Sequence, residues 1–129
     1  MMNDTLANAL SGILNYDVIG KKEFMVTPAS KITRQVLKIL NEQRYLGGGE
    51  VLTESRGGVI KVNLLGAINK CGVIKPRFAV TMNEYEKFEK RFLPAKGVGI
   101  IIVSTIKGFM IHEQAKEHNL GGRLIAYCY

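Results

Sequence analysis

Two stretches in the N-terminal half carry apolar residues at the three- and four-residue spacing of an α-helix. The first stretch follows Asp4 and Thr5, and either residue can cap a helix. The second follows Pro28-Ala29-Ser30, where Ser30 is the expected cap, and this helix is expected to end at Gly47-Gly48-Gly49. The apolar positions are Leu6, Leu10, Ile13 and Leu14 in the first helix and Ile32, Val36, Ile39 and Leu40 in the second.

Alternating patterns between and after these helices predict strands. Residues 23–27 read as one short strand, and residues 50–55 and 59–65 read as a hairpin that turns across Arg56-Gly57-Gly58. In the second hairpin strand, Ile60, Val62 and Leu64 alternate with Lys61 and Asn63. This alternation predicts a strand with one buried and one solvated face.

The C-terminal half is richer in strand patterns. One longer helix is expected there, capped by Asn83, with Tyr85, Phe88 and Phe92 on one side, and a short helix is expected from Glu113. The strands are expected near Val73, over 77–81, 98–103 and 109–111, and from Leu124 onward. The chain is therefore predicted to have an α+β fold of two small packed lobes. The N-terminal lobe, residues 1–66, has the order αβαββ, and the C-terminal lobe, residues 67–129, is β-rich with one longer and one short helix.

Composition narrows the classes of protein to consider. The chain has 129 residues, 47% hydrophobic and 22% charged, which is typical of a globular protein. Its net charge of +7 favours an anionic partner, and no carboxylate lies between Glu54 and Glu84. Two cysteines and the lack of a signal-peptide pattern indicate a reducing compartment, and no run is long enough to cross a membrane, so the protein is expected in the cytoplasm.

The loop motifs each have a structural and a functional interpretation. Ser104-Thr105-Ile106-Lys107-Gly108 is either a plain turn after a strand or a surface that holds a ligand by hydrogen bonds and charge. Gly121-Gly122-Arg123 is either a helix stop or a place where another backbone or a ribose approaches closely. Pro28-Ala29-Ser30-Lys31 starts a helix, and the same geometry attracts phosphate.

No enzymatic chemistry is apparent. The sequence has no Walker spacing, no metal-binding pattern and no paired general acid and base, and His112 is expected to be a cap or a surface residue. We therefore predict neither a cofactor nor a metal, and no enzyme. An enzyme for a small phosphorylated substrate is the weaker alternative, and a protein–protein adaptor would explain the +7 charge only with an acidic partner. The residues favour a module that binds folded RNA through sugar, phosphate and shape.

These motifs resemble the family of small-subunit ribosomal protein eight. The resemblance extends from Asp4 to Tyr129 and is most specific in four ordered stretches. They are Pro28-Ala29-Ser30-Lys31, the segment from Asn69 to Phe78, Ser104-Thr105-Ile106-Lys107-Gly108, and His112-Glu113-Gln114-Ala115-Lys116 with Gly121-Gly122. The Asn-Lys-Cys-Gly-Val-Ile block and the His-Glu-x-Ala element are more similar to the archaeal and eukaryotic branch than to the bacterial one.

The resemblance implies a structural constituent of the small ribosomal subunit. Such proteins are primary binders of the central domain of small-subunit ribosomal RNA, on a stem with an irregular core, and they nucleate assembly of the platform beside neighbouring ribosomal proteins. Some bacterial relatives also repress their own mRNA, which stays an open alternative for this chain. The RNA-binding residues implied by motif position are Thr5, Ser30, Lys31, Lys75, Ser104, Thr105, Ile106, Lys107, Gly108, Gly121, Gly122 and Arg123.

Two positions depart from the family pattern. Ile106 stands where the family usually has serine, so one hydroxyl contact is lost or replaced by apolar packing on a base. Arg123 stands where bacterial relatives have glutamate, which replaces a hydrogen-bond acceptor by a cation and favours phosphate.

Overall fold

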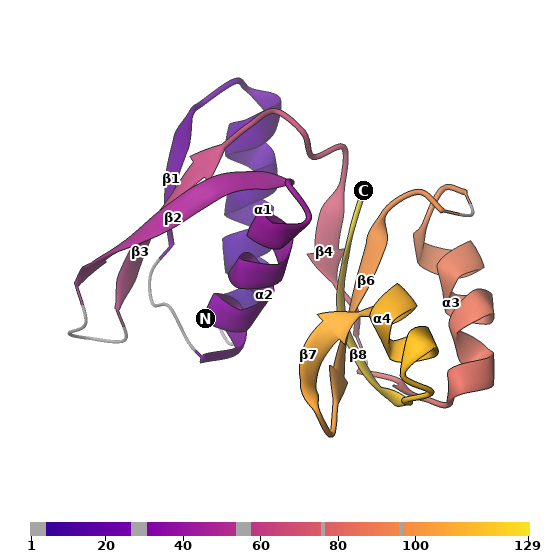
Figure 1. Cartoon of the computed structure of the whole chain (residues 1–129). Coiled ribbons are helices and arrows are strands. Elements are labelled where there is room, and N and C mark those ends of the chain that lie inside the picture. The colour runs from indigo at the N-terminus through magenta and orange to yellow at the C-terminus, as the bar shows by residue number, and fades with distance from the viewer. Residues whose placement is uncertain (1–4, 27–30, 54–57, 76, 96) are drawn as a thin grey trace. The chain divides into compact units, whose positions relative to one another are not determined.

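The computed structural model describes residues 5–26, 31–53, 58–75, 77–95 and 97–129, and its residue contacts group into two units, Met1–Asn69 and Lys70–Tyr129. Unit 1 has the order α1 (Thr5–Val18), β1 (Glu23–Val26), α2 (Lys31–Glu42), β2 (Leu46–Thr53) and β3 (Val59–Leu64) (Figure 1). Its three strands form an antiparallel sheet in the order β1-β3-β2, and α1 and α2 pack on it. The predicted αβαββ order is confirmed.

Unit 1 differs from expectation at the end of its second helix. The helix α2 ends at Glu42, and Gly47-Gly48-Gly49 lie inside β2, so the prediction that these glycines stop the helix is wrong. The stop is Arg44, which adopts a left-handed backbone with φ 64°. Its N–H donates to the Asn41 carbonyl, and the Tyr45 N–H donates to the Leu40 carbonyl, so these two carbonyls of the last turn are paired. A non-glycine residue in this conformation gives no signal in the sequence.

Unit 2 is a β-rich layer with helices on one face. It contains β4 (Cys71–Val73), β5 (Ala79–Val80), a 3₁₀ turn η2 (Met82–Glu84), α3 (Tyr85–Phe92), β6 (Ile100–Thr105), β7 (Gly108–Ile111), α4 (His112–Glu117) and β8 (Gly122–Cys128). The antiparallel sheet has the order β4-β8-β6-β7, and β5 also pairs with β8 (Figure 1). The final strand therefore lies at the centre of the sheet, although it is formed last along the chain. The α+β class and the β-rich C-terminal half are confirmed.

The longer helix of unit 2 starts differently from the prediction. Asn83 lies within η2 rather than at a cap, and Thr81 marks the start of the helical segment. The Glu84 carboxylate accepts hydrogen bonds from the Thr81 N–H and the Thr81 hydroxyl, both at 3.0 Å. These two bonds lower the pKa of Glu84 from its usual value. A Thr-x-x-Glu spacing is a known start signal for helices, and it was present in the sequence.

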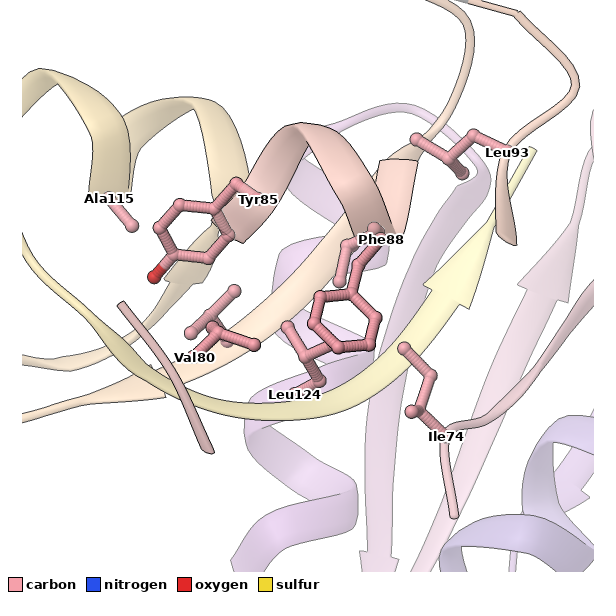
Figure 2. Close-up of a cluster of buried hydrophobic side chains, with 9 residues drawn as sticks. Ile74, Val80, Tyr85, Phe88, Leu93, Ala115 and Leu124 are labelled. Atoms are coloured by element: carbon pink, nitrogen blue, oxygen red, sulfur yellow. The ribbon is translucent and has the colours of Figure 1, made fainter. Parts of the chain in front are cut away.

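The core of unit 2 lies between α3, α4 and one face of the sheet. Phe88 points from α3 toward Leu124 of β8, and the Tyr85 ring lies next to Ala115 of α4 and Val80 of β5 (Figure 2). The Tyr85 hydroxyl donates to the Leu120 carbonyl at 2.9 Å, so this fully buried phenol keeps a partner. The cluster comprises Ile74, Val80, Tyr85, Phe88, Leu93, Ile101, Val103, Ala115 and Leu124. This packing leaves the alternate residues of β5, β6 and β8 on the opposite face.

Candidate nucleic-acid interface

The first part of the site is the tight turn that joins β6 to β7. Ser104 and Thr105 are the last residues of β6, and only Ile106 and Lys107 form the turn before Gly108 begins β7. The Thr105 hydroxyl donates to the Gly108 carbonyl at 2.8 Å and accepts from the Lys107 N–H at 3.2 Å. Gly108 has φ 113°, a conformation that glycine adopts without strain. The hydroxyl of Thr105 thus shapes the turn, and its single proton is used inside it.

The tip of this turn is an apolar residue beside a cation. The Ile106 side chain is 91% exposed, the highest value among the exposed large hydrophobic residues of the described chain, and Lys107 is exposed next to it. An exposed isoleucine gains nothing from the fold, because no burial offsets its contact with water. The tip therefore offers apolar surface and positive charge to a binding partner.

The second part of the site is the start of β8, where two glycines meet neighbouring backbones. A Cβ atom on Gly122 would lie 2.3 Å from the Ser104 carbonyl oxygen, and one on Gly121 would lie 2.5 Å from the Val80 carbonyl oxygen. The helix stop is instead Asn119, with φ 57°, whose N–H donates to the Lys116 carbonyl. These glycines are thus required by close packing of β8 between β5 and β6, which is the close approach of another backbone that the second interpretation of the motif named.

Strand pairing brings the two parts of the site together. Arg123 of β8 lies opposite Ser104 of β6 on one side and opposite Ala79 of β5 on the other, and Ser104 lies opposite Phe109 of β7. Directly opposed residues point to the same face of a sheet, so these four residues form one row across it. We call Ala79, Arg123, Ser104 and Phe109 the cross-strand row.

The cross-strand row lies on the sheet face opposite to α3 and α4. Its neighbours along the strands, Val80, Val103 and Leu124, belong to the helix-covered core, and successive side chains of a strand point to opposite faces. Ala79 and Arg123 are exposed, and Ser104 and Phe109 are partly exposed. The row thus presents a guanidinium, a hydroxyl and an aromatic ring side by side.

Charge is segregated in unit 2. Its side-chain carboxylates, at Glu84, Glu86, Glu89, Glu113 and Glu117, all lie on η2, α3 or α4. In residues 70–75, 77–81, 97–111 and 118–129, the charged side chains, leaving aside His118, are Lys70, Lys75, Arg77, Lys107 and Arg123. Within the described part of the chain, neither the Lys107 ammonium nor the Arg123 guanidinium is engaged in an ion pair. The strand and loop surface is therefore cationic and suited to phosphate.

A model of the family Ribosomal protein S8 matches residues 4–129. The chain belongs to the ribosomal protein S8 family. As an S8 protein it is a ribosomal protein of the small subunit, it binds ribosomal RNA, and it works beside other ribosomal proteins in a family that is structural rather than enzymatic. The predicted identity is confirmed at this level, and its place is in the ribosome.

The remaining expected contacts of this S8 protein are spread over both units. Lys75 follows β4 and is exposed, and the N–H of its neighbour Ile74 donates to the Ile125 carbonyl of β8 at 3.0 Å. In unit 1, Lys31 is the exposed first residue of α2, and Thr5 is the first residue of α1. Ser30 lies outside the described residues. The structure thus brings residues 104–108 and 121–123 together in one sheet. Thr5 and Lys31 are described within unit 1, separately from these residues.

Two members of the cross-strand row were missed by sequence reasoning. Phe109 and Ala79 carry no motif, and each reads as an ordinary strand residue. The alternation Phe109-Met110-Ile111 was the available signal, because Met110 packs against the helix-covered core and Phe109 must then point the other way. The pairing partner of β7 was still needed to place Phe109 beside Ser104.

His112 differs from the prediction that it caps a helix or lies at the surface. It is only 3% exposed, and its Nδ1 accepts the Ile101 N–H at 3.1 Å. Its Nε2 lies 3.4 Å from Oε1 of Glu89, which also accepts a hydrogen bond from the Lys116 ammonium. Burial lowers the pKa of His112 from its usual value, against the opposing charge of Glu89. His112 is a buried anchor because Ile101 lies just past the end of the β6–β7 ladder and needs an acceptor.

Among the described residues, no group of three or more His, Cys, Asp or Glu side chains could hold a metal ion. Of the helices in the described ranges, none has the length and apolar character needed to cross a membrane.

Proposed function

We propose that this S8 protein is a primary binder of the central domain of small-subunit ribosomal RNA and helps to nucleate assembly of the platform. The proposed RNA surface in unit 2 is the cross-strand row together with the turn at residues 105–108. The observation that carries the proposal is the pairing of β6 with β8, which sets Ser104 opposite Arg123 although the two lie in different motifs. A cation, hydroxyls, an aromatic ring and an apolar tip then occur on one small surface.

The chemistry of each residue assigns it a role on RNA. Arg123 and Lys107 are exposed cations for phosphate oxygens, with the planar guanidinium able to bind two oxygens at once. The Ser104 hydroxyl can donate or accept, whereas the Thr105 hydroxyl has its proton in use and can only accept. Thr105 is therefore suited to a ribose 2′-hydroxyl or a base amino group rather than to phosphate.

The apolar members of the surface are suited to unstacked bases. Phe109 and Ile106 offer the flat or apolar contact on which a splayed base can stack, and a stem with an irregular core supplies such bases. Gly108 adds no side chain to the turn, and an RNA backbone can therefore approach it closely. Gly121 and Gly122 contribute indirectly, because they let β8 lie against β5 and β6 and so place Arg123 in the cross-strand row. Thr5, Ser30, Lys31 and Lys75 are proposed to hold the backbone of the stem elsewhere on the protein.

The test is a filter-binding titration of the native central-domain stem and of the same stem with its irregular core replaced by Watson–Crick pairs. Arg123→Gln is expected to weaken binding to the native stem about tenfold and to lower the slope of log K against log salt by about 0.7–0.9, because one phosphate contact is lost. Lys90→Gln is the matched control, since it removes the same charge from an exposed position on α3. Equal binding to the two stems would overturn the proposal.

A second arm of the experiment concerns Thr105. Thr105→Val keeps the shape of the side chain but removes the hydroxyl that closes the turn, and it should weaken native-stem binding about fivefold, equivalent to about 1 kcal/mol. Thr105→Ser retains the hydroxyl and should bind nearly as the wild type does. If Thr105→Val weakened both stems equally, its role in recognising the irregular core would be withdrawn.

We further infer that the protein is of the archaeal and eukaryotic type, on the His112-Glu113-Gln114-Ala115 element and the Asn69-Lys70-Cys71-Gly72 block. Binding of its own mRNA is a second proposal, supported only by the same surface. Competition between the stem and the protein's own mRNA would test it. Failure of the mRNA to displace the stem would remove autoregulation and leave the ribosomal role intact.

A further inference from the structure

The two cysteines of the chain are far apart in sequence but directly opposed in the sheet. Cys71 of β4 is the register partner of Cys128 of β8. The flanking pair is Lys70 and Tyr129, which exchange two hydrogen bonds, from each N–H to the other's carbonyl at 2.9 Å. Antiparallel ladders alternate between hydrogen-bonded and non-hydrogen-bonded pairs, so Cys71 and Cys128 form a non-hydrogen-bonded pair.

That register gives the two thiols the geometry of a disulfide. Opposed residues at a non-hydrogen-bonded position have Cα atoms about 4.5 Å apart, with both side chains on the same face. Disulfides span Cα separations of about 4.4–6.8 Å. The bond can thus form across the ladder with little backbone movement.

Burial limits the reaction but does not prevent it. Cys71 is 6% exposed and Cys128 is 1% exposed, and buried thiols react slowly. Cys71, however, lies on a three-residue strand at the edge of the sheet. Short edge strands open locally far more often than the whole protein unfolds. Opening of β4 exposes Cys71 first and returns it to Cys128 on closing.

We propose that Cys71 and Cys128 are a reversible redox pair that closes to an intramolecular disulfide when the protein meets hydrogen peroxide. The Cys71 thiol loses its proton, the thiolate attacks one peroxide oxygen, and the O–O bond breaks to give a sulfenic acid. The leaving hydroxide takes up that proton and departs as the first water. The Cys128 thiol then attacks that sulfur, the S–O bond breaks, and the second water leaves as the S–S bond forms. Two thiols are oxidised and one peroxide is reduced to two waters.

The bridge encloses nearly the whole of unit 2, because it joins the second residue of Lys70–Tyr129 to the second-last. Closing a long loop removes disorder from the unfolded chain, so the melting temperature should rise by about 10 °C on oxidation. The cross-strand row lies four residues away along β6, from Ile100, the partner of Cys128, to Ser104, which is about 13 Å. RNA affinity is therefore expected to be unchanged by the bridge.

The experiment treats the full native chain with hydrogen peroxide and measures intact mass, thiol content in denaturant, and melting temperature. The expected result is a monomer that is lighter by two hydrogens, has no titratable thiol, yields a Cys71–Cys128 linked peptide, and melts about 10 °C higher until dithiothreitol restores both thiols. Thiols that persist, a mass gain from sulfinic acid, or bridged dimers would each overturn the proposal.

The matched control is Cys128→Ala, which retains Cys71 but cannot form the bridge, and Cys71→Ala serves if the first variant folds poorly. Neither variant should lose two hydrogens or gain in melting temperature on oxidation. A rise of equal size in a single-cysteine variant would show that another oxidation causes it, and the redox pair would be rejected.

Discussion

At the scale of single residues, Gly122 shows how a site can depend on a missing side chain. Its backbone passes so close to β6 that a Cβ would lie 2.3 Å from the Ser104 carbonyl oxygen and 2.9 Å from Cγ1 of Val103. The neighbour that would have to move is backbone of a central strand, which yields only at a cost. The same close approach places Arg123 opposite Ser104. A packing requirement therefore builds part of the proposed RNA surface.

Gly122→Ala is expected to lower the free energy of unfolding by about 2–4 kcal/mol, because β8 must move away from β6. Urea denaturation measures it. Gly108→Ala is the matched control, since a Cβ there meets no atom within 4 Å and only the φ of 113° opposes it, at about 1–2 kcal/mol. An equal or smaller loss in Gly122→Ala would contradict the steric explanation.

At the scale of elements, α4 is fixed to β6 and α3 by polar contacts of His112 and Lys116. His112 accepts the Ile101 N–H of β6, while Lys116 and His112 both meet the Glu89 carboxylate of α3. The Ile101 N–H requires a lone pair on Nδ1, so the neutral ring with its proton on Nε2 fits this position. Protonation of Nδ1 would set two donors against each other.

This arrangement predicts a loss of stability in mild acid. Burial lowers the pKa of His112 in the folded protein below the 6.5 of the unfolded chain, so the unfolded state takes up the proton first. The contribution of His112 to the free energy of unfolding is then expected to be constant above about pH 7.5. Below pH 6.5, it should make the free energy of unfolding fall by at most about 1.4 kcal/mol per pH unit. Urea titrations between pH 7.5 and 5.5 measure the slope.

Two variants isolate the histidine that causes this slope. His112→Gln should be less pH-dependent than the wild type in the same window, since its amide can accept from Ile101 without titrating. His118→Gln changes the exposed histidine that follows α4 and should retain the full slope. A wild-type slope in His112→Gln would assign the acid sensitivity to other groups.

At the scale of the whole molecule, the charge of +7 acts on stability and on RNA binding with opposite signs. Like charges repel one another in the compact state, and salt screens them over about 8–10 Å at moderate ionic strength. Attraction to phosphates is weakened by the same salt. Few carboxylates offset the cations on the strand and loop surface of unit 2, so both effects should be clear.

We expect the melting temperature of the RNA-free protein to rise by a few degrees between about 50 and 300 mM NaCl, while affinity for the stem falls by about 10³-fold or more if several phosphates are contacted. Differential scanning fluorimetry and filter binding in matched buffers measure the two quantities. A melting temperature that fell with salt would mean that attractive ion pairs, rather than net repulsion, dominate the folded state.

The sequence by itself determined the class of fold and the family of the protein. Helical spacing in residues 6–14 and 32–40 and alternation in 59–65 placed elements correctly, because each period fixes which face is apolar. Four ordered motifs sufficed for the family. The ends of two helices could not be predicted from the sequence. Arg44 and Asn119 adopt there the left-handed backbone that glycine usually adopts.

Only the tertiary structure decided which distant residues meet. Pairing of β8 with β5 and β6 sets Arg123 beside Ser104 and explains Gly121 and Gly122. Pairing of β8 with β4 opposes Cys71 to Cys128, and no periodicity in the chain encodes these choices of partner. The burial of His112 also depends on long-range pairing. Its Nδ1 accepts the Ile101 N–H, which lies just past the end of the β6–β7 ladder, and that end exists only once β6 and β7 have paired. Local patterns report each element's faces, whereas long-range register is fixed by the packing of the whole sheet.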